Sequence, residues 1–485
     1  MHRYLIGCLV LATMLAVTGC GEDDPAGPVP IVLPGENEEI IYSKHVQPIF
    51  TNSCGGSGCH LGTEEGGGLK LDNWERVMAG TKEFGAVVVP YYGAKSHLFQ
   101  HVNIDTTLGE VALPTMPIGR DPLPMEQILT IRRWIDEGAK NDQGEVALAG
   151  ADRPRVFVTC QDDDVVAAID LATQRVMRYI DVGEVAGGFP ESPHNIVFSP
   201  DGRFIYVNMI AAGLLEKYDA RTFQKLGSVR VGSSPAQVAV TKDGSTLYVS
   251  NFDVSLNQLF INKVAAATMT VTDTIYDVGN APHGVILSED ERFLYTTNAL
   301  GDDISEIDLQ TMEISRRILI SPNFPLPPGG RARYEPYQGE IGPDGHTLWV
   351  TCRNSNDVRV IDLELGRVVD SIPVGTRPLI PRFTPDKREF WVSNRGSDNI
   401  SIIDPMTRRV VTTIRDIQIQ PHAVDFTADG SLAFVSCENL NGERHHGTLD
   451  EGAVPGLVYV IDVATRKVIR KIEVGSFAAG ITVQR

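Results

Sequence analysis

The sequence predicts a multidomain protein in which a small α-helical domain is followed by an all-β seven-bladed propeller. The chain has 485 residues, enough for two domains that each bury a core. Residues 40–142 contain stretches with helical apolar spacing, whereas residues 153–485 consist of short Val-, Ile- and Tyr-rich runs separated by turn residues. These runs repeat one four-strand unit, and seven copies of such a unit predict a seven-bladed propeller.

Composition is ordinary for a soluble globular protein, with 42% apolar and 22% charged residues. The formal net charge of −19 argues against nucleic acid or anionic lipid headgroups as partners, because like charges repel. It is compatible with steering toward a basic partner protein and equally with a solubilising acidic surface. No interior run approaches the roughly 18 apolar residues of a membrane span.

The N-terminus predicts an export signal over residues 1–19. His2 and Arg3 precede an apolar run from Tyr4 to Val17, and Cys20 follows at once after Thr-Gly. This pattern resembles a bacterial lipoprotein signal, which implies that Cys20 is lipidated and begins the mature chain. An ordinary cleaved signal peptide is the alternative, and both predict export. Residues 20–39 are rich in Pro, Gly and acidic residues, which favours a flexible tether.

The stretch Cys54-Gly-Gly-Ser-Gly-Cys59-His60 predicts covalent haem attachment. Two thiols can add to the vinyl groups of a haem, and the adjacent imidazole then becomes an iron ligand. The usual spacing has two residues between the cysteines, whereas four stand here. The intervening glycines suit a loop that must turn tightly against the porphyrin. The alternative is a surface loop closed by a Cys54–Cys59 disulfide.

Two helices are expected in residues 40–142. Residues 44–50 predict a short helix that leads into the cysteine stretch, and residues 121–124 open a second helix that Gly138 ends. The apolar side of the second helix is predicted to comprise Ile128, Leu129, Ile131, Trp134 and Ile135. Two helices and a Gly/Pro-rich middle give a thin core, which a large apolar haem would complete.

Met116 is the predicted second axial ligand of the haem iron. It lies between prolines in Leu113-Pro-Thr-Met-Pro-Ile-Gly119, which favours a stiff extended loop. A thioether is a soft axial ligand that raises the haem potential. The alternative is a loop methionine that packs on an apolar patch. Met78 and Met125 are expected to be helical and core-facing, and the competing histidines ranked behind Met116 are His45, His97 and His101.

Residues 41–141 resemble the planctomycete-type cytochrome c domain of exported bacterial proteins. The matching segments are HVQPIFTNSCGGSGCH, GGGLKLDNWERVMAG, VVVP followed by SHLFQHV, LPTMP, and ILTIRRWIDEGAKN, and they span the domain in order. The resemblance implies one covalent haem c on Cys54 and Cys59, with His60 and Met116 as axial ligands. Residues 91–95 depart from the Gly-rich turn usual in that family, so the local loop shape is expected to differ.

The propeller repeat is marked by a Ser/Thr-Pro-Asp-Gly-like turn and by an Ile-Asp position. The turns are at Ser199–Gly202, Thr241–Gly244, Ser288–Glu291, Gly342–Gly345, Thr384–Lys387 and Thr427–Gly430, and the second mark is at Asp170, Asp219, Asn262, Asp308, Asp362, Asp404 and Asp462. The domain begins at a second strand, Val156–Cys160, and ends at a first strand, Phe477–Val483. One blade is therefore predicted to combine both chain ends, which removes the open edge. The repeats resemble YVTN-family β-propellers.

Three histidines are predicted at the mouth of the axial channel, each directly after a proline at the start of an innermost strand. They are His194, His283 and His422. The long insertions are predicted on the same face, at Gly183–Ser192, Pro322–Glu335 and Leu440–Pro455. The histidines could bind a metal, a haem or an anion, or simply cap the channel through hydrogen bonds and water. Residues that could join such a site are Tyr337, Arg377 and Arg382.

The chain enters the propeller on the opposite face, so the first domain is expected there unless the linker Asn141–Arg153 wraps around the ring. The remaining cysteines, Cys160, Cys352 and Cys437, are predicted to be buried inert thiols. The pair His445-His446 is expected in a solvated loop rather than a metal site.

Together these features favour an exported monohaem cytochrome c, lipid-anchored on the periplasmic side of a bacterial membrane, that transfers electrons to or from a periplasmic redox partner. Haem c is attached outside the cytoplasm in bacteria, so the motif and the export signal agree. The propeller would bind a protein or ligand. One alternative is an oxidoreductase with a centre at His194, His283 and His422, although no nucleophile–base pair stands out. The other is a haem-free binding lipoprotein.

Overall fold

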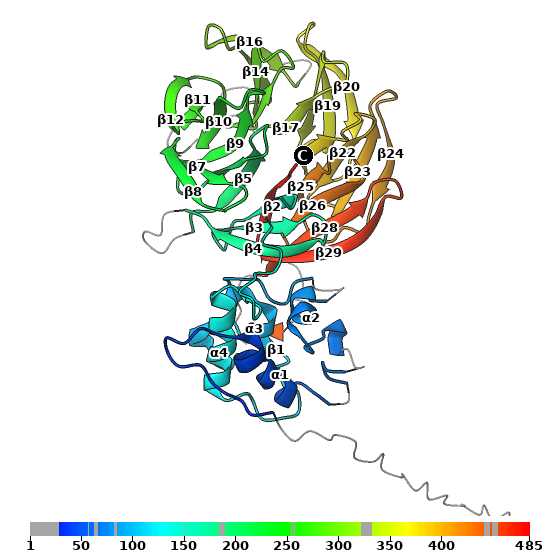
Figure 1. The fold of residues 1–485 in the computed structure, drawn as a ribbon. Coiled ribbons are helices and arrows are strands. Elements are labelled where there is room, and N and C mark those ends of the chain that lie inside the picture. The colour runs from blue at the N-terminus through cyan, green and yellow to red at the C-terminus, as the bar shows by residue number, and fades with distance from the viewer. Residues whose placement is uncertain are drawn as a thin grey trace, which may run out of the picture.

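A computed structural model describes residues 29–485 except 57, 63–65, 82–84, 151, 184–189, 254, 256–257, 322–331, 441–446 and 449–453. It contains a small helical domain, residues 29–142, beside a ring of β-sheets (Figure 1). Cys20, residues 1–19 and the pair His445-His446 lie outside the described residues, as do the tether up to residue 28 and most of each of the three insertions.

The ring is a seven-bladed propeller, because the described residues form seven four-stranded antiparallel sheets besides one two-stranded pair. The first three blades are β5 (Pro193–Phe198), β6 (Phe204–Met209), β7 (Leu214–Asp219) and β8 (Lys225–Arg230); β9 (Pro235–Val240), β10 (Thr246–Asp253), β11 (Gln258–Ala265) and β12 (Thr270–Ile275); and β13 (Pro282–Leu287), β14 (Phe293–Asn298), β15 (Asp303–Asp308) and β16 (Glu313–Leu319).

The next three blades are β17 (Pro336–Ile341), β18 (Thr347–Cys352), β19 (Asp357–Asp362) and β20 (Arg367–Pro373); β21 (Pro378–Phe383), β22 (Phe390–Asn394), β23 (Asn399–Asp404) and β24 (Arg409–Ile414); and β25 (Pro421–Phe426), β26 (Leu432–Cys437), β28 (Pro455–Asp462) and β29 (Lys467–Ser476). The seventh combines β2 (Arg155–Cys160), β3 (Val165–Asp170) and β4 (Arg175–Asp181) with β30 (Ala478–Val483). β30 pairs antiparallel with β2, so the predicted closure by both chain ends is confirmed.

Side chains of the repeat marks stabilise the turns between strands. Ser199 donates its hydroxyl to Asp201 at 2.6 Å, and Gly202 has a φ of 67°, which glycine adopts without strain. The recurring aspartate at the end of the third strand accepts backbone N–H groups of the following turn, as Asp219 does from Thr222 at 2.8 Å. The sequence therefore repeats because similar side chains stabilise the corresponding turns of successive blades.

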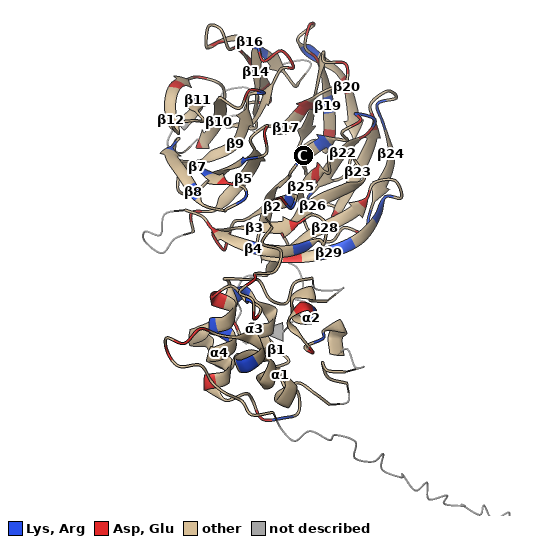
Figure 2. Cartoon of the chain, viewed as in Figure 1, with Lys and Arg blue, Asp and Glu red and all other residues tan. Residues whose placement is uncertain are grey.

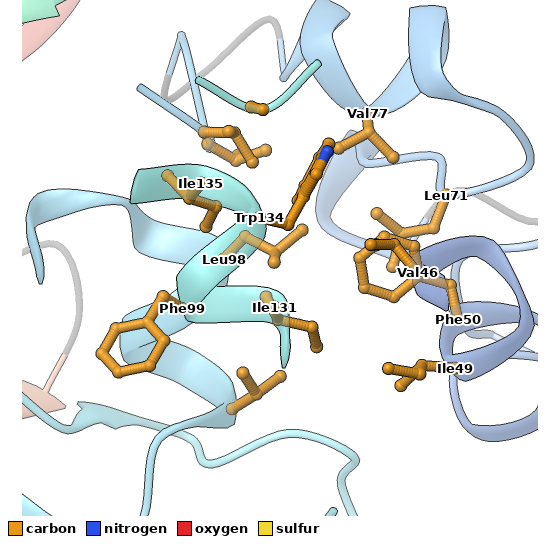
Figure 3. Close-up of a cluster of buried hydrophobic side chains, with 14 of the residues drawn as sticks. Val46, Ile49, Phe50, Leu71, Val77, Leu98, Phe99, Ile131, Trp134 and Ile135 are labelled. Carbon is orange, nitrogen blue, oxygen red and sulfur yellow. The ribbon is translucent and has the colours of Figure 1, made fainter. Parts of the chain in front are cut away.

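The helical domain is built from short elements around one core. They are η1 (Tyr42–Val46), α1 (Gln47–Ser53), η2 (Gly66–Gly68), α2 (Trp74–Ala79), η3 (Gly93–Lys95), α3 (His97–Val102), η4 (Thr106–Leu108), β1 (Ala112–Leu113) and α4 (Met125–Asp136). Ile49 and Phe50 of α1 belong to the same buried cluster as Ile131 and Trp134 of α4 (Figure 3). The predicted helix before the cysteine stretch is confirmed, and it continues to Ser53.

The closing helix α4 has the predicted inner stripe, with Ile128, Ile131, Trp134 and Ile135 at most 1% exposed. It ends at Asp136, and Gly138 follows with a φ of 109°. Leu129, by contrast, is 43% exposed, so its assignment to the apolar side was wrong. Met125 is 37% exposed at the first residue of the helix, before the stripe begins, and was also wrongly expected in the core. Met78 is buried as expected.

The helical domain lies against the outer strands β4 and β29, at the rim of the propeller (Figure 1). The Lys95 ammonium is 2.7 Å from a carboxylate oxygen of Asp163, in the β2–β3 loop. That loop is on the face opposite the one where the chain enters β2. The linker therefore wraps along the rim, and the simpler expectation of a domain on the entry face was wrong. Acidic and basic residues occur in both domains (Figure 2).

Candidate functional site

A cavity of about 340 Å³ opens in the helical domain between the end of α1, helix α3 and the loop that follows β1. Its apolar walls include Phe50, Leu69, Leu71, Leu98 and Val102. The cavity also has the four predicted haem-binding residues in its lining: Cys54, Cys59, His60 and Met116. Residues more than 50 positions apart in the sequence are thus brought to one apolar pocket.

Cys54 follows the last turn of α1, where its N–H donates to the carbonyl of Phe50 at 2.8 Å. Its side chain is 8% exposed and carries a free thiol. Burial raises the pKa of this thiol to about 12, so it is protonated at neutral pH. Cys59 is half-buried in the same cavity wall. A disulfide between Cys54 and Cys59, the alternative that the sequence left open, is not formed in this structure.

The loop between the cysteines turns as its glycines predict. Gly56 has a φ of 126° and Gly58 a φ of 76°, conformations that other residues rarely adopt. A Cβ on Gly56 would also lie 2.9 Å from the Arg120 guanidinium. Gly66 is equally constrained, because its Cβ would lie 2.8 Å from the Gly58 carbonyl oxygen and 3.2 Å from Cε1 of His60. Glycine therefore leaves the His60 ring and the cavity wall unobstructed.

His60 is oriented by its backbone and by its ring. Its N–H donates to the Cys54 carbonyl at 3.1 Å, and its Nδ1 lies 3.3 Å from the Leu69 carbonyl oxygen. A carbonyl can only accept, so Nδ1 carries the proton and Nε2 carries the lone pair. Metal-ligating histidines are typically held in this way, with the second ring nitrogen donating to an oxygen of the protein.

Met116 enters the cavity from the loop after β1. Its N–H donates to the carbonyl of His101 in α3 at 2.7 Å. His97 and His101 also line the cavity, and Nδ1 of His101 lies 2.9 Å from the Pro114 carbonyl oxygen. His45 does not line it, because this fully buried ring accepts the Ile41 N–H at 3.0 Å elsewhere in the core. The structure therefore leaves two of the competing histidines beside Met116.

Sequence reasoning missed Arg120, which also lines the cavity. Its guanidinium donates to the carbonyl of Gly55 at 2.8 Å and reaches that of Ser53 at 3.5 Å. It thereby ties the loop after Met116 to the loop between the cysteines. The only hint in the sequence is a lone arginine directly after Gly119. Two thiols, an imidazole nitrogen and a thioether around an apolar pocket form a donor set that suits a covalent haem.

The three propeller histidines also lie together. The ring centroid of His194 is 6.1 Å from that of His283 and 5.5 Å from that of His422. All three side chains are buried at the start of innermost strands. Burial lowers the pKa of His194 to about 3 and that of His283 well below its usual value, so both rings are neutral. Neutral imidazoles disfavour the predicted anion site.

Each of these rings has an oxygen near Nδ1. The partners are the Glu438 carboxylate for His422 at 2.8 Å, the Tyr337 carbonyl for His283 at 3.0 Å and the Gln161 amide oxygen for His194 at 3.4 Å. Nε2 of His422 is buried without a hydrogen-bond partner. Within the described residues, however, no group of three or more His, Cys, Asp or Glu side chains has the spacing of a metal site.

Glu438 is the residue of this cluster that sequence reasoning missed. Its carboxylate, 2% exposed, also receives two N–H donors from Arg395. Burial raises the pKa of Glu438, but hydrogen bonds from His422 and Arg395 outweigh it and lower the pKa to about 2. Its position directly after Cys437, at the end of β26, is marked in the sequence only by the repeat.

Of the residues expected to join the histidines, only Tyr337 does so. Its ring stacks on His283 with centroids 3.8 Å apart. Arg382 lies further along its strand and pairs with Glu340 at 2.7 Å, while Arg377 is exposed ahead of β21. The three propeller cysteines are buried free thiols, as predicted: Cys160, Cys352 and Cys437.

The comparison with protein families supports the propeller. Residues 150–318 match the family model described as lactonase, 7-bladed beta-propeller. Hydrazine synthase from Kuenenia stuttgartiensis is similar at 23% identity, with 59% of this chain and 80% of that one covered and a TM-score of 0.45. Dihydro-heme d1 dehydrogenase NirN in complex with DHE is similar at 14% identity, with 84% and 95% covered and a TM-score of 0.48.

No curated relative matches the chain. Among the described residues, no helix combines the length and the apolar character needed to cross a bilayer. The matched family stretch covers less than half of the chain and lies almost wholly within the ring. The family model and the observed strand order agree on a seven-bladed β-propeller, and the structure places a small helical domain before it.

Proposed function

We propose that this chain is an exported, lipid-anchored monohaem c-type cytochrome that transfers electrons on the periplasmic side of a bacterial membrane, and whose propeller binds a partner or ligand. The observation that carries the proposal is the cavity in which Cys54, Cys59, His60 and Met116 meet. Export is inferred from residues 1–19, and the lipid anchor from Cys20.

Each of these cavity residues would have its own role in binding a haem. The Cys54 and Cys59 sulfurs would form thioether bonds, with each thiol hydrogen passing to the vinyl carbon next to the new bond. His60 would ligate iron through Nε2, since its Nδ1 is held by the Leu69 carbonyl. Met116 would supply the opposite, thioether ligand. When bound, the haem supplies one-electron chemistry at its iron.

The test is the visible absorption spectrum of the mature protein, purified from the periplasm of a host that attaches haem c. We expect haem absorption that stays with the polypeptide after denaturation, because the proposed haem is covalently bound. The double variant Cys54→Ala/Cys59→Ala should be colourless. Cys160→Ala is the matched control, since Cys160 is a buried free thiol of the propeller and should leave the spectrum unchanged. A colourless wild-type protein would contradict the proposal and leave a haem-free binding lipoprotein.

A second candidate function is an oxidoreductase with its catalytic centre at the mouth of the propeller channel. The observation that favours it is the His422–Glu438 pair, in which a buried carboxylate holds Nδ1 and Nε2 is left without a partner. This arrangement suits a group that accepts a proton from a bound substrate. His194 and His283 would line the same site as neutral rings.

Elemental analysis and ligand extraction of the full-length protein test this candidate. A compound or metal other than haem iron that is retained by wild type and lost in both His283→Ala and His422→Gln would support a site there. Retention in both variants would place the bound species elsewhere in the protein and contradict it.

A further inference from the structure

One strand of the propeller lies inside the helical domain. β27 (Gly447–Thr448) comes from the segment that connects β26 to β28 in the sixth blade, yet it pairs with β1 rather than with that blade. The two strands are antiparallel, with Ala112 opposite Thr448 and Leu113 opposite Gly447. In Figure 1, β27 is the short orange segment beside β1.

β1 leads directly into the loop that carries Met116. Only Pro114 and Thr115 separate the end of β1 from that methionine. The loop is also held by its own domain, since the Met116 N–H donates to the His101 carbonyl at 2.7 Å and Nδ1 of His101 lies 2.9 Å from the Pro114 carbonyl oxygen. The methionine loop is thus fixed by α3 from its own domain and by β27 from the propeller.

Backbone pairing matters here because β1 is buried where it begins. Val111 and Ala112 are each 1% exposed, so unpaired backbone groups at this point could not turn to bulk water. Leaving a buried donor or acceptor without a partner is costly, and β27 is the strand that pairs with β1 among the described residues. Without β27, the start of the loop would have to find another conformation.

The segment that bears β27 is anchored beside the channel histidines. Asn439 donates its side-chain amide to the carbonyl of Pro455 at 2.7 Å, and the Leu440 N–H donates to the side chain of Gln420 at 2.9 Å. Glu438, the partner of His422, immediately precedes Asn439. The strand that pairs with β1 is therefore connected to a fixed stem in the sixth blade.

We propose that β27 is a positioning element for the sixth ligand of the haem iron: the propeller holds the methionine loop through β1, so that Met116 ligation depends on the propeller. This inference rests on the proposed function, because it takes the cavity to hold haem. It assigns β27 no contact with the iron. Its effect is to favour the loop conformation in which Met116 lines the cavity.

The test uses the full-length protein with Gly447→Pro/Thr448→Pro, which removes both N–H donors of β27 and restricts its backbone. Gly447→Ala/Thr448→Val is the matched control, since it keeps both N–H groups. The readouts are the amount of covalent haem, the ferric absorption band that arises from methionine-sulfur-to-iron charge transfer, and the midpoint potential. The milder Thr448→Pro serves if the double proline variant is not recovered.

We expect covalent haem to be retained in every variant, because Cys54, Cys59 and His60 lie on a separate loop. The proline variants should lose methionine ligation roughly two- to tenfold relative to wild type, the change expected for one lost hydrogen bond. Their midpoint potential should fall accordingly, whereas the control should match wild type.

Three results would overturn the inference. A proline variant with the wild-type band and potential would show that β27 does not position Met116. An equal loss of methionine ligation in the control would show that backbone pairing is not the cause. A haem-bearing wild type without the methionine band would remove the ligand itself, whereas a wild type without haem would defeat the proposed function instead.

Discussion

The imidazoles of His60 and His422 are each held at Nδ1 by an oxygen acceptor, which leaves Nε2 as the ring atom available for chemistry. The acceptors differ, and so does the consequence. A carbonyl, as at Leu69, fixes the tautomer without adding charge, which suits a metal ligand. A carboxylate, as at Glu438, also places a negative charge beside the ring, which suits a proton acceptor. The oxygen acceptor at Nδ1 thus suits one histidine to metal ligation and the other to accepting a proton.

Met116 and His101 can be distinguished as ligands by single substitutions. Axial ligands set haem potentials over a range of roughly 0.8 V, and we expect Met116→Ala to lower the midpoint by on the order of a tenth of that range. The reason is that a thioether stabilises ferrous iron more than water or an imidazole does. His101→Ala should preserve the methionine charge-transfer band. Should His101 be the ligand, wild type would lack that band, and redox titration would show a shifted midpoint in His101→Ala but not in Met116→Ala.

Glu438→Gln should destabilise the propeller by roughly 3–5 kcal/mol at pH 7, because it leaves the buried ring of His422 and the partly buried guanidinium of Arg395 without their carboxylate. The pKa of Glu438 is lowered from 4.5 to about 2, so its contribution is present above pH 4.5 and is lost as pH falls toward 2. The difference between variant and wild type should therefore shrink over that range in urea unfolding followed by tryptophan fluorescence.

The matched control is Asp370→Asn, which removes the partner of Arg408 in an exposed pair with an N···O distance of 3.8 Å. Exposed pairs contribute little, so we expect a change of at most about 1 kcal/mol at any pH. An equal loss in both variants would mean that burial of Glu438 has no special role.

At the scale of single elements, α4 shows how a helix serves two surfaces. Its inner stripe packs against α1 in the core of the helical domain, while Arg132 and Arg133 on its outer side form i,i+4 pairs with Asp136 and Glu137. Burial decides which positions matter, because apolar contacts dominate helix stability in proteins. Leu129 is apolar like the residues of the inner stripe, but it lies on the exposed side of the helix.

Ile135→Ala should lower the local stability of α4 by about 2–5 kcal/mol, since a fully buried isoleucine leaves a cavity when it is truncated. Leu129→Ala, at a position that is 43% exposed, should change it by less than about 0.5 kcal/mol. Hydrogen exchange of the amides of Met125–Asp136 measures both, and comparable effects would contradict the observed orientation of the helix.

At the scale of the whole molecule, the segment 91–95 joins the two domains. The Arg178 guanidinium lies 3.7 Å from the ring centroid of Tyr91, and Tyr92 packs against Tyr179 with centroids 5.1 Å apart. Lys95 completes the contact through its ion pair with Asp163. These are the residues at which the sequence departs from the cytochrome family it resembles. The departure therefore marks the surface that docks on the propeller.

Removing residues 478–485 should open the propeller, because β30 supplies the inner strand of the seventh blade and leaves β2 as an unpaired edge. We expect aggregation or a large loss of thermal stability, measured by size-exclusion chromatography and calorimetry. Removing only Gln484 and Arg485 is the control, since both follow the strand: it keeps β30 and loses only their contacts with Arg155, Gly202 and Asp425. A monomeric, equally stable protein after the longer truncation would contradict this account of ring closure.

The sequence by itself determined what depends on local pattern. The helical spacing of apolar residues predicted α4, and the recurring turn residues predicted the number of blades. The point in the repeat at which the chain begins and ends predicted that β30 closes the ring. The spacing of Cys54, Cys59 and His60 predicted a haem-attachment motif, and that role stays a prediction. Each of these features is encoded within a few neighbouring residues, so it can be read without knowing where the chain goes next.

Only the tertiary structure decided what depends on distant partners. It brought Met116 to the cysteine loop, placed Glu438 on His422, docked residues 91–95 on the rim and paired β1 with β27. These contacts join segments that lie apart in the chain, so no local pattern in the sequence specifies them. Packing of the whole molecule selects among them, because burial requires every polar group to find a partner wherever the fold has placed it.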